Sequence, residues 1–121
     1  PYDPGVADEG PWRDACAELN AATRLPWVLL SGGVGDATFE AQVRVACGAG
    51  ASGVLVGRSV WAESATHPPV ERDAFLRTTG RERLRRLVGL ADELGQPWHA
   101  RPTPLATLPD PPEGWYRGYP A

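Results

Sequence analysis

Two short polar clusters in this sequence have the residue types that bind an anion. Ser31, Gly32 and Gly33 follow one apolar run, and Gly57 and Arg58 follow a second. Glycine lets a ligand approach backbone N–H groups closely, and the serine hydroxyl is a further donor. The arginine adds a planar cation that can donate two N–H groups to phosphate oxygens. Together the two clusters predict a site for a phosphate or another anion.

Each polar cluster follows a run with the length of a buried strand. The runs cover residues 27–30 and 53–56, and every residue in them is apolar or glycine. A continuous apolar run is typical of a parallel strand that is covered on both faces. Parallel strands with a crossover between them end at the same edge of a sheet. We therefore expect the two clusters to meet at that edge.

The segment between the two runs predicts an amphipathic helix. Asp36 or Thr38 is a suitable N-cap, and Gly50 follows its last turn. Glu40 and Arg44 have the spacing of an exposed ion pair. One face of this helix carries the apolar residues Phe39, Val43, Ala46 and Cys47.

These residues resemble the last two strands of class I aldolases, which form a Schiff base and fold as a (β/α)₈ barrel. The segments that carry the resemblance read LPWVLLSGGV and AGASGVLVGRSVW. They are most similar to the tagatose-1,6-bisphosphate aldolase group and to its relatives that cleave sulfofructose-1-phosphate. The resemblance is densest between Leu25 and Ala62, and it extends more loosely from Trp12 to Trp98.

The resemblance implies an α/β fold: residues 1–99 correspond to the C-terminal part of a TIM barrel, strands seven and eight with their helices. Residues 100–121 form a Pro-rich tail. In this family the loops after those two strands hold the substrate phosphate, as in many TIM barrels. The matching positions for a phosphorylated ketose are Ser31, Gly32, Gly57 and Arg58.

The resemblance also implies a carbon–carbon lyase that needs no metal or other cofactor. A lysine forms a Schiff base with the ketose, and cleavage releases an aldehyde and dihydroxyacetone phosphate. All 12 Lys and Arg residues of this chain are arginines. A Schiff base requires a lysine amine. The family's lysine and acid/base carboxylate have no matching position, so we expect no catalytic residue here and no activity from the chain alone.

Length and the first residue favour a part of a larger protein. The chain has 121 residues and begins with proline, whereas a (β/α)₈ barrel typically has about 250. The alternative is a non-catalytic unit, either a small phosphate-binding domain or a structural α/β remnant. The missing lysine is the main support for that alternative.

Composition excludes some partners. The formal net charge of −3 gives no general attraction to nucleic acid or to an anionic membrane. No apolar run approaches the roughly 18 residues of a membrane-spanning helix, so a soluble cytoplasmic protein is expected. Cys16 and Cys47 lie on apolar helix faces without the spacing of a metal site. They are predicted to be buried thiols rather than a disulfide or zinc ligands.

The flanking segments are expected to be helical. A helix opening near Pro11 precedes the first strand. Trp61, after the second strand, is predicted to fill the core, and the alternative is that it packs under the phosphate loop. From Val70 to Gly95 the chain is helical again, with an interruption near residues 78–80. Its buried stripe is predicted to contain Leu84, Leu87, Val88, Ala91 and Leu94.

Two further groups of residues lie near the C-terminus. Four arginines between residues 81 and 86 are interrupted by a glutamate, which favours a solvated helix face over a polyanion site. In the tail, Trp115, Tyr116 and Tyr119 are available to pin the chain to its own body or to a neighbouring subunit of a homo-oligomer.

Overall fold

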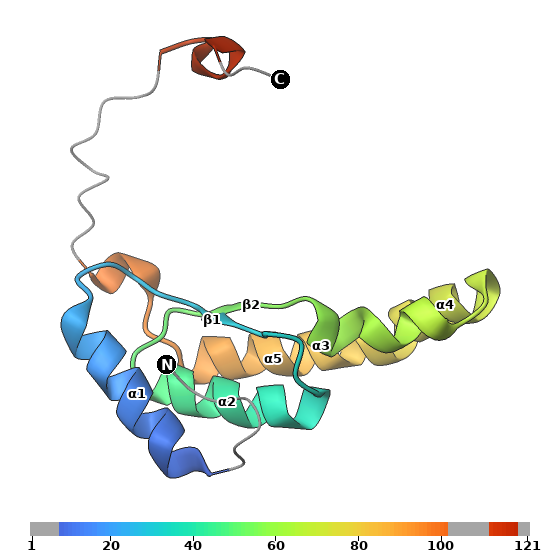
Figure 1. Cartoon of the computed structure of the whole chain (residues 1–121), viewed down its shortest axis with the longest axis horizontal. Helices are drawn as coiled ribbons and strands as arrows, with labels where there is room; N and C mark the ends of the chain where they lie inside the picture. Colours follow the sequence, from blue (N-terminus) through green and yellow to red (C-terminus); the bar gives the residue numbers. More distant parts are fainter. Residues whose placement is uncertain (1–7, 102–111, 119–121) are drawn as a thin grey trace.

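The computed structural model describes residues 8–101 and 112–118. It contains helices and a two-stranded sheet (Figure 1). The main elements are α1 (Glu9–Ala22), β1 (Leu29–Leu30), α2 (Asp36–Gly48), β2 (Val54–Leu55), α3 (Arg58–Trp61), α4 (Pro69–Phe75) and α5 (Arg81–Leu94). Shorter helical turns are η1 (Ala62–Thr66), η2 (Leu76–Gly80), η3 (Trp98–Ala100) and η5 (Trp115–Gly118). In this part of the chain, no helix is long and apolar enough to cross a membrane.

The two strands are parallel, as the sequence predicts. Leu29 pairs with Val54, and Leu30 pairs with Leu55. The backbone N–H of Ser31 donates to the carbonyl of Leu55 over 3.1 Å, so pairing continues to the carboxyl ends of both strands. Because α2 connects the strands, the polar clusters that follow them lie at the same edge.

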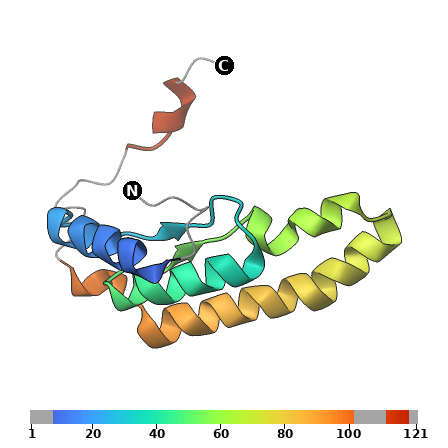
Figure 2. The same ribbon diagram turned by 60° about the horizontal axis from the view of Figure 1, so that its bottom comes forward.

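Helix α2 is at the centre of the core. Phe39, Val43 and Ala46 are fully buried on the predicted face. Helix α2 packs against both α1 and α5, and Figure 2 shows it between the strands and α5. The predicted ion pair on the exposed side of α2 also forms, with 3.0 Å between Arg44 Nη2 and Glu40 Oε1. The sequence therefore predicted this helix and its buried side correctly.

The sheet is covered on one face only, although continuous apolar runs are typical of strands that are covered on both faces. Val28, Leu30 and Leu55 are 52%, 60% and 59% exposed. In Figures 1 and 2, α2 and α5 lie on the same side of the strands. Within residues 8–101 and 112–118, no element packs over the opposite side. The continuous apolar runs therefore leave an apolar sheet face open.

Helix α5 corrects two expectations about the segment after Val70. The expected interruption is a π-helical segment, η2, which joins α4 to α5 without a break. Leu87 and Leu90 are buried, but Leu84 and Val88 are 42% and 47% exposed, and Leu94 is 37% exposed. Helix α5 meets the body mainly through α2, so only the side facing α2 is covered.

Ion pairs join α2 to α5 and explain two further corrections. Gly35, not Asp36 or Thr38, is the N-cap of α2, and it makes no side-chain capping bond. The Asp36 carboxylate instead lies 2.8 Å from Arg86 Nη2 and 3.4 Å from Arg83 Nε. Arg83 also meets Glu63 over 2.9 Å, and its side chain is only 15% exposed. Arg83 is therefore a half-buried structural residue and not part of a solvated face.

The amino ends of the strands are joined by a polar cluster around Asn20. Asn20 Oδ1 accepts a hydrogen bond from Trp27 Nε1 at 3.0 Å and another from Arg101. Arg101 also donates to the carbonyl of Thr23 over 2.9 Å. Gly50, which has a φ of +105°, lies so close that a Cβ there would be 2.5 Å from Asn20 Oδ1. This Asn20 cluster connects four segments of the chain.

The predicted role of the tail aromatic residues, pinning the chain to its own body or to a neighbouring subunit, lies outside the described part of the molecule. The side chains of Trp115 and Tyr116, and the whole of Tyr119, are not among the described groups. The division into residues 1–99 and 100–121 also stays a prediction, although the side chain of Arg101 is bound to the body.

Candidate anion-binding site

The loop after β1 is a tight glycine turn. Gly32 and Gly33 have φ angles of +59° and +85°, which residues with a Cβ rarely adopt. The turn is closed by the N–H of Val34, which donates to the carbonyl of Ser31 over 3.3 Å. Ser31 itself is buried, with 4% exposure. The two glycines are therefore needed for the shape of the turn, independently of any ligand.

The segment after β2 reaches across to this turn. Arg58 Nη2 donates a long hydrogen bond of 3.5 Å to the carbonyl of Gly32. A Cβ on Gly33 would lie 2.9 Å from Arg58 Cζ, so the guanidinium rests against the bare Cα of that glycine. The next residue, Ser59, is buried and donates from Oγ to the carbonyl of Val34 over 2.7 Å. The structure thus brings together Ser31, Gly32, Gly57 and Arg58, the predicted phosphate-binding residues.

These residues line a cavity of about 410 Å³ at the carboxyl edge of the strands. In the described part of the chain, the backbone N–H groups of Gly32, Gly33 and Gly57 and the Ser31 hydroxyl make no hydrogen bond. The single Arg58 contact is long and therefore weak. The cavity combines unused neutral donors with one cation, which is the donor set that an oxyanion requires.

Sequence reasoning favoured the wrong position for one residue of this site and missed another. Trp61 was predicted to fill the core, with packing under the phosphate loop as the alternative, but it is 46% exposed and lines the same cavity. The reason is that Ser59 and Val60 take the buried positions of α3, which leaves Trp61 at the cavity. Ser59 was not singled out, although it joins the two loops. Its position directly after the arginine was the only available signal.

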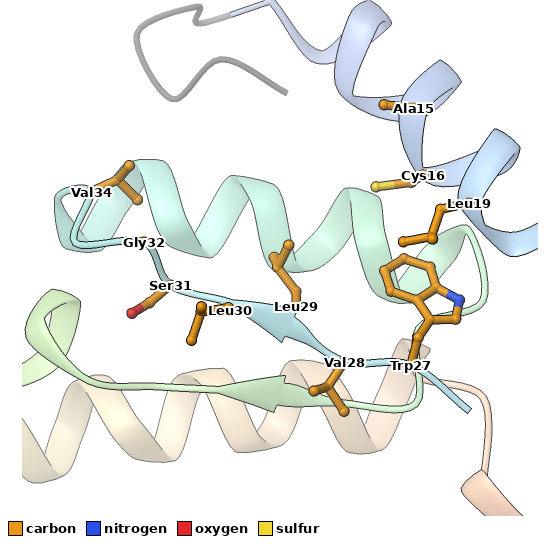
Figure 3. Close-up of a pocket in the computed structure, with 10 residues that line it drawn as sticks. All are labelled: Ala15, Cys16, Leu19, Trp27, Val28, Leu29, Leu30, Ser31, Gly32 and Val34. Carbon is orange, nitrogen blue, oxygen red and sulfur yellow. The ribbon is translucent and has the colours of Figure 1, made fainter. Parts of the chain in front are cut away.

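A second, apolar cavity of about 350 Å³ lies between α1 and the free edge of β1. Figure 3 shows the side chains of Leu19 and Trp27 turned toward each other at one end of it. Ser31 and Gly32 contribute to its opposite end, so this groove leads toward the loops that follow the two strands. With apolar walls and few polar groups, it is suited to a packed polypeptide and not to an anion.

The two cysteines are buried and unpaired, as predicted. Burial raises the pKa of both thiols above its ordinary value, and the neighbouring Cys16 further raises the pKa of Cys47. Both thiols are therefore neutral and poorly nucleophilic near pH 7. In residues 8–101 and 112–118, no group of three or more His, Cys, Asp or Glu residues is arranged to hold a metal ion.

Comparison with known proteins gives a family match. Residues 7–63 match the model of the DeoC/LacD family aldolase. This matched segment contains all four predicted phosphate-binding residues. Over a longer stretch the chain is homologous to tagatose-bisphosphate aldolases, which confirms the resemblance seen in the sequence.

Three relatives show the extent of this similarity. Tagatose 1,6-diphosphate aldolase 2 of Enterococcus faecalis is 35% identical over 91 residues, which cover 69% of this chain and 27% of the relative. Tagatose 1,6-diphosphate aldolase 1 of Streptococcus pyogenes is 36% identical over 90 residues, covering 69% and 28%. Tagatose 1,6-diphosphate aldolase of Lactococcus lactis is 36% identical over 84 residues, covering 64% and 26%. The chain thus spans about a quarter of the length of these relatives.

Proposed function

We propose that this chain carries the phosphate-binding part of a class I aldolase that cleaves a phosphorylated ketose to dihydroxyacetone phosphate and an aldehyde. The observation that carries the proposal is the approach of Arg58 to the Ser31–Gly33 turn across the carboxyl edge of the strands. Unused N–H groups surround the same cavity. The relatives are named for aldolases of a phosphorylated sugar, which supports a sugar phosphate as the ligand.

The proposal places β1 and β2 as strands seven and eight of a (β/α)₈ barrel. Two parallel strands with a helical crossover are one unit of such a barrel. The open face formed by Val28, Leu30 and Leu55 would then point into the barrel, where apolar side chains are packed. The groove between α1 and β1 would hold the preceding strand, which pairs with the free edge of β1.

The proposed reaction depends on a lysine outside this chain. Its amine forms an iminium with the ketose carbonyl and releases water. The family's acid/base carboxylate, also outside this chain, takes the proton of the hydroxyl on the β-carbon, and the bond between the α- and β-carbons breaks to release the aldehyde. The bonding electrons form an enamine, which takes up a proton and is hydrolysed to dihydroxyacetone phosphate. The anion-binding loops hold the phosphate and so fix the distance between carbonyl and lysine, which is a positioning role.

The cytoplasmic location expected from the sequence is part of this proposal.

The test is to substitute Arg58 in the complete gene product that contains this chain. Arg58→Ala should weaken binding of dihydroxyacetone phosphate by about 2 to 4 kcal/mol, because a charge pair covered by protein is lost. Arg58→Lys should recover only part of this, since ammonium lacks the planar fork. The unphosphorylated ketone should bind equally to all three proteins.

Arg44→Ala is the matched control, because it removes the same charge from an exposed ion pair on α2. Its phosphate affinity should equal that of the unsubstituted protein. If Arg58→Ala and Arg44→Ala have equal effects, or if Arg58→Ala weakens both ligands equally, the phosphate assignment is wrong.

A non-catalytic phosphate-binding or structural unit is the second candidate. The observation that favours it is that the 121 residues contain no lysine. The gene sequence upstream of the codon for Pro1 distinguishes the two candidates. A strand carrying a lysine in the same reading frame supports the aldolase, and a stop codon followed by a separate start supports the second candidate.

A further inference from the structure

Trp61 has an unusual position for a large aromatic residue. It ends the short helix α3 three positions after Arg58, and it is 46% exposed at the edge of the anion-binding cavity. Its backbone is fixed on both sides: its N–H donates to the carbonyl of Gly57 at 3.4 Å, and its carbonyl accepts from Ser64 Oγ at 2.7 Å. The buried Ser64 therefore helps to hold the backbone of Trp61 beside the cavity.

The indole N–H faces the same point as the Ser31 hydroxyl. A Cβ placed on Gly57 would lie 3.9 Å from Trp61 Nε1 and 4.0 Å from Ser31 Oγ. Because Gly57 has no side chain, a space remains above its Cα, and this space is flanked by Trp61 Nε1 and Ser31 Oγ. Within the described residues, neither atom has a hydrogen-bond partner. A ligand atom in this space can meet both donors.

The chemistry of the two donors selects the ligand. An indole N–H donates and cannot accept. Beside the cationic Arg58, it favours an acceptor-only group such as a phosphate oxygen and disfavours an ammonium group. The ring itself forms an apolar wall that excludes water from one side of the bound group, which strengthens the hydrogen bonds made there.

We propose that Trp61 is a further phosphate-contacting residue, whose indole N–H and the Ser31 hydroxyl bind phosphate oxygens in the space above Gly57. This inference rests on the proposed function of the site. It assigns the affinity for phosphate to three side chains, Ser31, Arg58 and Trp61, together with the glycine N–H groups.

The first experiment compares Trp61→Phe with Trp98→Phe in the complete gene product. Trp61→Phe keeps an aromatic ring but removes the N–H, so affinity for inorganic phosphate should fall about 10- to 150-fold, the loss of one hydrogen bond to a charged group. Trp98 is 65% exposed and lies outside the cavity, so Trp98→Phe should leave the affinity unchanged. Equal affinities for the two variants would overturn the inference.

The second experiment does not depend on the folding of a variant. In protein labelled with ¹⁵N, inorganic phosphate is titrated while the indole N–H signals and the amide signals of Gly32 and Gly57 are recorded. The Trp61 indole signal should shift with the same dissociation constant as the two amides. If the amides shift and the Trp61 indole does not, the inference is wrong and the phosphate site remains. If none of these signals shifts, the proposed function fails and the inference fails with it.

Discussion

Gly33 offers a way to displace Arg58 without changing it. A methyl group at position 33 would lie 2.9 Å from both Cζ and Nη2 of Arg58. Non-bonded carbon atoms prefer about 3.5 to 4.0 Å, so Gly33→Ala should push the guanidinium by roughly 0.5 to 1 Å. Gly32→Ala is a matched control, because its backbone is also left-handed, with a φ of +59°, and nothing lies within 4 Å of the added methyl group.

The two substitutions should have similar effects on stability. A left-handed conformation costs a residue with a Cβ roughly 1 to 2 kcal/mol, and this cost applies to both variants. The guanidinium is the end of a flexible side chain, so its displacement should add little to the free energy of unfolding. Phosphate affinity should differ, because a displacement of about 1 Å at a positioning group can cost up to about 100-fold.

The assay measures denaturant unfolding and calorimetric binding of dihydroxyacetone phosphate in the complete gene product. We expect Gly33→Ala to bind about 10- to 100-fold more weakly than Gly32→Ala at equal stability. Adding Gly33→Ala to Arg58→Ala should then change binding little, because both act through one contact. Equal phosphate affinities of the two glycine variants, or additive losses in the double variant, would refute the role given to Arg58.

Three further outcomes follow from other parts of the molecule. The 121-residue chain alone, with its N-terminal amine blocked, should not be trapped by borohydride in the presence of dihydroxyacetone phosphate, and a stable adduct would contradict the Schiff-base account. The isolated chain should self-associate through its open sheet face, which analytical ultracentrifugation can measure. Leu30→Glu should reduce the self-association. Val70→Glu, at a position of α4 that is 83% exposed, should leave it unchanged. Burial raises the pKa of both thiols in the folded chain, so the free energy of unfolding should be unaffected below the ordinary thiol pKa and should decrease as pH rises above it. Unfolding measured as a function of pH should show a smaller decrease for Cys16→Ala and for Cys47→Ala than for the unsubstituted chain.

The residues that sequence reasoning placed correctly are those governed by local rules. The face of α2 with Phe39 and Val43 follows from helical periodicity, and the Ser31–Gly33 turn follows from glycine's access to positive φ. Local spacing also predicted the pair of Glu40 and Arg44. These features need no knowledge of distant parts of the chain.

The errors concern contacts between distant segments. Asp36 was expected to cap its own helix, but two arginines about 50 positions later compete for its carboxylate. Trp61 was assigned to the core because it is large and apolar, but Ser59 and Val60 take the buried positions of α3 and Trp61 lines the cavity. Leu84 and Val88 follow the apolar helical pattern, but exposure depends on which neighbours are present. The spacing of residues along the chain does not predict such contacts between distant segments.

The Asn20 cluster gives the two ends of the strands different evolutionary freedom. At the amino ends, one amide receives hydrogen bonds from Trp27 and Arg101 and fills the space beside Gly50. Loss of the Asn20 amide would remove the acceptor that Trp27 and Arg101 share, so selection there acts on the amount of folded protein. At the carboxyl ends, the N–H groups of Gly32, Gly33 and Gly57 and the Ser31 hydroxyl make no hydrogen bond within the described residues. Substitutions of Ser31 or Trp61 at the proposed phosphate site can therefore change ligand affinity without breaking a side-chain hydrogen bond, whereas the turn glycines stay under selection for the shape of the loop.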